Sequence, residues 1–135
     1  MKNNSLSPEL FRVIDANINR LKEGIRVVED VIRYKDNNKE LSSKLKSLRH
    51  KAQIKETQQL LQHRDSINDV LRPSTKSEQN RSSLEDILTA NFKRAEESAR
   101  VLEELYKLEN IKYSENFKTL RYELYNLEKE VMLNR

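Results

Sequence analysis

The chain has 135 residues, with 36% hydrophobic and 36% charged side chains and a net charge of +4. This is enough for one domain, 1–135, and the composition excludes a turn-rich sheet protein, a nucleic-acid binder with a one-sided basic face, and a membrane protein. Without cysteine there is no thiolate metal site, and Gly24, the only glycine, cannot form a glycine-rich phosphate loop.

The first half of the chain predicts two helices. A helix should begin at Pro8, with Ser7 as its N-cap, and run to about Tyr34. A polar turn follows, and a second helix is expected over 38–62, with a bend allowed. The predicted buried stripe of the first helix has alternating spacings of four and three residues; it comprises Ile14, Ile18, Leu21, Ile25, Val28 and Ile32.

The second half predicts two more helices. The third should cover 82–107 and open with a capping box in which Glu85 reaches back to Ser82. The fourth should cover 114–133, with Ser114 as its cap. The stripe of the third helix copies that of the first and comprises Leu88, Phe92, Ala95, Ala99, Leu102 and Tyr106.

A segment of the first helix recurs in the third. Residues 15–31 align with 89–105, 74 positions later, and seven of 17 positions are identical. The identical pairs are Ala16/Ala90, Asn17/Asn91, Arg20/Arg94, Glu23/Glu97, Arg26/Arg100, Val27/Val101 and Glu29/Glu103. Because most of these are polar, amphipathic periodicity alone does not explain them. We therefore expect an all-α, four-helix arrangement of two duplicated helical hairpins, about 8–62 and 82–133, with pseudo-two-fold symmetry.

Two of the repeated positions suggest a binding pocket. Asn17 and Arg20, copied as Asn91 and Arg94, lie beside the buried stripe in a second stripe that is apolar at its ends and polar in its middle. Such groups are either satisfied by neighbouring helices or line a pocket for an anionic ligand. Three flanking charges, Glu23, Arg26 and Glu29, are predicted to point further outward, where surface salt bridges explain the pattern at least as well as a function does.

The segment 63–81 breaks the helical periodicity. A connection of this length is typically functional or disordered, and we expect 64–69 to be ordered and 73–80 to be mobile. Within it, Asp65 and Asp69 could hold a hydrated magnesium ion or act as a base beside Arg64, although turn chemistry explains the same residues.

The start of the third helix offers a second candidate site for a phosphate. Arg81 precedes Ser82 and Ser83 there, so a guanidinium and two hydroxyls adjoin free backbone N–H groups. Plain capping of the helix explains the same sequence equally well.

These motifs together resemble a small family, the compact hydroxymethylpyrimidine phosphate kinases of thiamine biosynthesis. The resemblance covers Ser7 to about Leu108. It is carried by Asp15-Ala16-Asn17, Asn19-Arg20, Glu23-Gly24, Arg26-Val27, Glu29-Asp30, Leu48-Arg49-His50, Arg64-Asp65-Ser66, Asp69-Val70, Arg81-Ser82-Ser83-Leu84, Asn91-Phe92, Arg94, Glu97, Arg100-Val101 and Glu103-Glu104. One departure is the loop after Asp65: the family usually has a glycine there, and this chain has Ile67, Asn68 and Leu71.

The resemblance implies transfer of the γ-phosphoryl group of ATP to 4-amino-5-hydroxymethyl-2-methylpyrimidine phosphate, with Mg²⁺. The family's domain occurs alone or fused ahead of thiamine-phosphate synthase, so association with that enzyme and a homodimer both stay open. We expect a cytoplasmic protein, because the N-terminal residues do not resemble a signal peptide. The rival interpretation is a non-catalytic helical accessory or adaptor domain of the synthase.

The expected site has four groups of residues. The catalytic candidates are Arg64 and Asp65, and the magnesium candidates are Asp65 and Asp69. The candidates for binding the substrate and its phosphate are Asn17, Arg20, Arg81, Asn91 and Arg94. The candidates for a supporting role are Glu23, Arg26, Arg49, His50, Ser82, Glu97 and Arg100.

Overall fold

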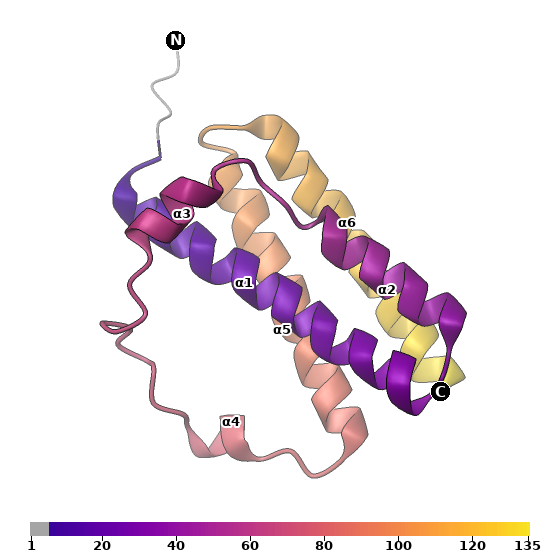
Figure 1. The fold of residues 1–135 in the computed structure, drawn as a ribbon. Coiled ribbons are helices and arrows are strands. Elements are labelled where there is room, and N and C mark those ends of the chain that lie inside the picture. Colours follow the sequence, from indigo (N-terminus) through magenta and orange to yellow (C-terminus); the bar gives the residue numbers. More distant parts are fainter. Residues whose placement is uncertain (1–5) are drawn as a thin grey trace.

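A computed structural model describes residues 6–135, apart from the side chain of Ser77 (Figure 1). Every regular element in this part of the chain is a helix, so the all-α prediction is confirmed. The elements are α1 (Pro8–Asp30), the π-helix η1 (Val31–Lys35), α2 (Lys39–Lys51), α3 (Thr57–His63), α4 (Lys76–Gln79), α5 (Leu84–Tyr106) and α6 (Ile111–Asn134). No helix among the described residues is both long and apolar enough to cross a membrane.

The two long helices α1 and α5 lie against each other at the centre of the fold and run in opposite directions (Figure 1). They approach each other closely at Gly24. A Cβ atom at this position would lie 2.9 Å from the carbonyl oxygen of Asn91 and 3.3 Å from the Cβ of Ala95. The absence of a side chain at Gly24 therefore allows the two backbones to cross at short range.

Both predicted stripes are buried, because α2 packs on α1, α6 packs on α5, and α2 also contacts α6. Leu45, Leu48, Leu124 and Val131 from α2 and α6 are each at most 1% exposed and close the same core. A single apolar core thus holds the four main helices together. The side of α1 and α5 that faces away from α2 and α6 lies toward the segment that joins α3 to α5 (Figure 1).

The prediction of one helix over 38–62 was wrong. Helix α2 ends at Lys51, Ala52 leaves the helical conformation with φ −79° and ψ 68°, and α3 begins only at Thr57. Ala52 and Ile54 are both buried. Side chains two residues apart in a helix point in nearly opposite directions. The chain therefore leaves the helical conformation where both Ala52 and Ile54 are buried.

Two helix starts also differ from the prediction. Helix α6 is capped by Asn110, which accepts a hydrogen bond from the backbone of Tyr113. Ser114, the predicted cap, instead donates from Oγ to the carbonyl oxygen of Glu103 at 2.8 Å. Because Asn110 and Ser114 are both typical N-cap residues, the sequence alone does not determine at which of them the helix begins.

The capping box at the third helix was misplaced by one residue. Ser83, not Ser82, caps α5 and accepts from the backbone N–H of Asp86. The carboxylate that reaches back is Asp86, whose Oδ2 accepts from both the backbone N–H and the hydroxyl of Ser82. Glu85 instead pairs with Arg135.

Candidate functional site

Two adjoining cavities lie along α1. The first, of about 790 Å³, is lined by α1 and the loop that follows α3. The second, of about 670 Å³, is lined by α1, α5 and Glu78 of α4. Because Asn17, Arg20 and Glu23 line both, the cavities form one continuous groove, and we call them its first and second compartments.

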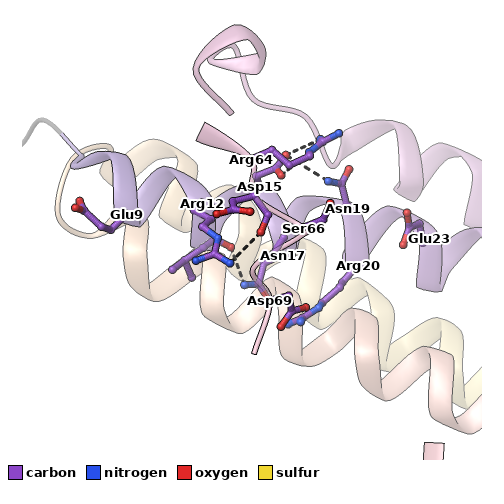
Figure 2. Close-up of a pocket in the computed structure, with 13 residues that line it drawn as sticks. Glu9, Arg12, Asp15, Asn17, Asn19, Arg20, Glu23, Arg64, Ser66 and Asp69 are labelled. Carbon is purple, nitrogen blue, oxygen red and sulfur yellow. Dashed lines mark hydrogen bonds and ion pairs between the residues drawn. The ribbon is translucent and has the colours of Figure 1, made fainter. Parts of the chain in front are cut away.

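The first compartment depends on an ion pair that fixes the loop to α1. Arg64 donates from Nε and Nη2 to the two carboxylate oxygens of Asp15, each at 2.7 Å (Figure 2). Asp15 is only 5% exposed and also accepts from Asn19. The Asp15 carboxylate raises the pKa of Arg64. Arg64 is therefore occupied as a loop anchor, and its predicted catalytic role would have to act through that anchoring.

The two loop aspartates line the first compartment but have turn-forming contacts. Asp65 accepts from the backbone and side-chain nitrogens of Asn68, at 3.1 and 2.8 Å, and these bonds lower the pKa of Asp65. Asp69 accepts from the backbone of Leu71. A carboxylate with a lowered pKa is a weaker base. Turn chemistry, the alternative interpretation of these residues, thus accounts for the contacts present.

Sequence reasoning missed two residues of this compartment. Arg12 donates from Nη2 to the carbonyl oxygen of Asp65 at 2.9 Å and so holds the loop at a second point. Asp15 belongs to the repeated segment, yet its counterpart in the copy is Thr89. This difference between the two copies could have indicated the role of Asp15, because only the first half of the chain is followed by the loop that begins with Arg64.

Asn17 and Asn91 behave alike, and not as predicted for donors to a ligand. Their amide nitrogens donate within their own helices, to the carbonyl oxygens of Val13 at 2.9 Å and Ile87 at 2.8 Å. Asn17 and Asn91 are 6% and 8% exposed. Only Asn17 lines the groove, so the structure does not bring all four repeated Asn and Arg residues into one pocket.

Arg20 and Arg94 do share the second compartment, and both are exposed to solvent. Among the described residues, neither has an ion pair or hydrogen bond with another side chain. Lys93 also lines this compartment, but its Nζ lies 3.3 Å from Glu96 and 3.3 Å from Glu128. Three cations in this compartment face three carboxylates, those of Glu23, Glu78 and Glu97.

Several predicted supporting residues lie outside the groove, where other residues of the described chain hold them. Arg26 pairs with Asp30, and Arg100 with Glu104 and more distantly with Glu103. Ser82 bonds to Asp86, and His50 is exposed on α2. Of the supporting residues, only Glu23 and Glu97 line the groove. Arg81, which was predicted to bind phosphate, also lies outside the groove and donates to the backbone of Asn80.

Arg49, another predicted supporting residue, is part of the helix packing. Its Nε and Nη2 bond to both oxygens of Glu29, at 2.7 and 3.2 Å, and Glu29 is 1% exposed. The prediction that Glu29 points outward was therefore wrong. Arg121 and Glu103 form the corresponding pair between α6 and α5, with Nη2 and Oε1 at 2.8 Å.

Comparison with known proteins identifies the family of the chain. The chain is 39% identical over 129 residues to a thiamine-phosphate synthase of Thermosynechococcus vestitus and 38% identical over 127 residues to one of Nostoc sp.. These matches cover 93% and 91% of the chain but 36% and 35% of the relatives, so it spans about a third of their length. No solved structure matches the chain. Residues 12–130 match the ThiD2 family, and the chain belongs to that family.

Proposed function

We propose that this protein acts in thiamine biosynthesis as a kinase that transfers the γ-phosphoryl group of ATP to hydroxymethylpyrimidine phosphate, giving the diphosphate. Membership of the ThiD2 family and relatives named thiamine-phosphate synthase support the pathway. The synthase reaction itself is not proposed, because a β/α barrel of about 200 residues or more would be needed. The described residues form only helices.

The observation that carries the proposal is the two-compartment groove with a shared arginine. Each compartment has the size of a small-molecule site, typically about 300 to 1,000 Å³. Phosphoryl transfer requires two substrates held in line and positive charge around the transferred group, with little covalent chemistry from the protein. A groove with two adjoining spaces and Arg20 at their boundary meets that requirement.

Magnesium is part of the proposal, as the ion that accompanies ATP. Asp65 and Asp69 offer carboxylates to the first compartment. In the described part of the chain, no three acidic or histidine side chains form a metal-binding group. Mg²⁺ usually keeps several waters and takes one or two carboxylates together with substrate phosphates, and the residues present fit that mode. The ion would neutralise charge on the phosphates during transfer.

We also propose that the two halves of the chain are structural copies related by a two-fold axis. The matching asparagine bonds of Asn17 and Asn91 support this. The Glu29–Arg49 and Glu103–Arg121 pairs, which join the two helices of each half, support it as well.

One observation favours the alternative, an accessory domain without activity. The loop after the groove exposes three large aliphatic side chains, Ile67, Val70 and Leu71, at 80%, 90% and 81%. Exposed apolar groups gathered on one loop are typical of a surface that binds another protein. In an adaptor these side chains would contact a synthase, and the groove would have no turnover.

The two functions are separated by measuring ADP formation by the folded chain with ATP, Mg²⁺ and the pyrimidine monophosphate. We expect ADP to form with the monophosphate and at least about 10-fold more slowly with the unphosphorylated alcohol, because the phosphate makes charge-assisted bonds to arginine. Arg20→Ala should lower turnover strongly, while Arg26→Ala, an equal charge change outside the groove, should not. No ADP with either substrate would favour the accessory domain.

A further inference from the structure

We infer that the second compartment binds the polyphosphate chain of a nucleoside triphosphate between Arg20 and Arg94, and that the first compartment takes the phosphorylated pyrimidine. This inference rests on the proposed kinase and assigns each of its two substrates to a place in the groove.

The partners of the basic side chains carry the assignment. Five cations line the groove, and three are already engaged: Arg12 by the Asp65 carbonyl, Arg64 by Asp15, and Lys93 by Glu96 and Glu128. The two without a partner in the described chain, Arg20 and Arg94, both line the second compartment. A ligand can bind them without breaking an ion pair, and each guanidinium can bond two phosphate oxygens.

The helix crossing places these arginines on two different helices. Arg20 is one turn before Gly24 on α1, and Arg94 adjoins Ala95 on α5, so each lies close to the contact of Gly24 with Asn91 and Ala95. The compartment is also lined by the small or apolar residues Ala90, Ser98 and Val101. A chain of linked phosphates has enough oxygens to bind both guanidinium groups at once. A single phosphate would have to share its oxygens between them.

The first compartment is more acidic than the second, in which three cations and three carboxylates are balanced. It is lined by three arginines and by five carboxylates, those of Glu9, Asp15, Glu23, Asp65 and Asp69. A triphosphate carries more negative charge than the pyrimidine monophosphate, so it is disfavoured more strongly there. Asn19 and Ser66 also line this compartment and suit the amino group and ring nitrogens of a pyrimidine. Arg20, which lines both spaces, is then adjacent to the donor and acceptor phosphates.

Equilibrium binding, measured by titration calorimetry without turnover, tests the assignment. The probes are ATP with Mg²⁺ in the absence of pyrimidine, and the pyrimidine monophosphate alone. Arg94→Ala should raise the Kd for ATP about 10-fold or more and change that for the pyrimidine phosphate less than about 2-fold. Arg20→Ala should weaken both, and Arg26→Ala neither. Inorganic tripolyphosphate should compete with ATP, while adenosine should not.

Each outcome decides between distinct conclusions. Unchanged ATP binding in Arg94→Ala, or equal weakening in Arg26→Ala, overturns the inference, as does a selective loss of pyrimidine phosphate binding in Arg94→Ala. Arg94-dependent ATP binding without any ADP formation supports the inference and counts against the kinase. ADP formation that does not depend on Arg94 counts against the inference and supports the kinase. Circular dichroism of each variant establishes that its helix content is unchanged.

Discussion

Arg49 binds Glu29 through two hydrogen bonds across the interface of α1 and α2, and the Glu29 carboxylate is almost completely removed from solvent. Arg121 and Glu103 repeat the arrangement between α6 and α5. A buried carboxylate is tolerated only when its charge is paired and its oxygens are bonded. The repeated glutamate and arginine thus join the two helices of each hairpin rather than forming a ligand site.

Arg49→Ala should destabilise the protein by about 3 to 5 kcal/mol, because it leaves the buried charge of Glu29 without its partner. The free energy of unfolding from urea titration measures the effect. The matched control is Arg26→Ala, which removes an exposed pair with Asp30 and should cost at most about 1 kcal/mol. Equal effects of the two substitutions would show that the Glu29 pair is not needed for the packing.

Gly24→Ala should destabilise the fold although alanine is the better helix former. The helix propensity favours alanine by about 1 kcal/mol, whereas overpacking costs about 1 to 3 kcal/mol. The new Cβ would meet the backbone oxygen of Asn91 at 2.9 Å, which cannot move aside as a flexible side chain can. Urea titration measures the sign of the change in the free energy of unfolding. Gly24→Ala should also impair the groove, as should Arg20→Ala. A stabilised Gly24→Ala variant would contradict this account of the α1–α5 crossing.

Glu96 should make stability depend on pH. Burial and the neighbouring Glu128 raise the pKa of Glu96 to about 8, against the opposing effect of Lys93. The folded protein therefore keeps the proton that the unfolded chain loses near pH 4.5. The resulting stabilisation is present below that pH and is lost as the pH rises through about 8.

Glu96→Gln, which resembles the protonated acid, isolates this effect. Relative to the unmodified protein, the variant should gain stability progressively between pH 5 and about 8 and show no further gain above that range. Urea midpoints measured across this range test the sign. Glu97→Gln serves as the control, because Glu97 is exposed. A difference between variant and parent that stays constant with pH would contradict the expectation.

Asp15→Asn should release the loop that forms the wall of the first compartment. An amide cannot accept both guanidinium bonds of Arg64, so residues 65–72 should open more often. Limited proteolysis with thermolysin, which cleaves before large aliphatic residues, should cut this loop several-fold faster. Asp30→Asn removes an exposed helix pair instead and should leave the rate unchanged. Equal rates for both variants would show that Arg12 alone is sufficient to hold the loop.

Much of the fold could be predicted, because apolar spacing records which face of a helix is buried. The stripes of α1 and α5 were read correctly down to Ile32 and Tyr106, and both are 1% exposed. The break after Lys51 was missed because no glycine or proline marks it. The signal was the spacing of Ala52 and Ile54, which cannot lie on one face of a helix.

The site was predicted less well, since a sequence shows which polar residues accompany a core but not which of them bind one another. Arg20 and Arg94 were identified from the repeat and do line one compartment. Arg49, from the same motif set, could not be distinguished from them, because its partner Glu29 lies 20 residues away. Long-range pairs of this kind become visible only when the helices are placed in space.

The anchor between Asp15 and Arg64 also limits what the duplication can do. Two similar hairpins would offer two equivalent surfaces for a ligand, but only the one beside α1 receives a loop, because the copy has Thr89 in place of the anchoring acid. Under the proposed assignment, the repeat therefore has a single binding face. Arg94, in the second half of the chain, would then contribute to the groove beside α1 instead of to a site of its own.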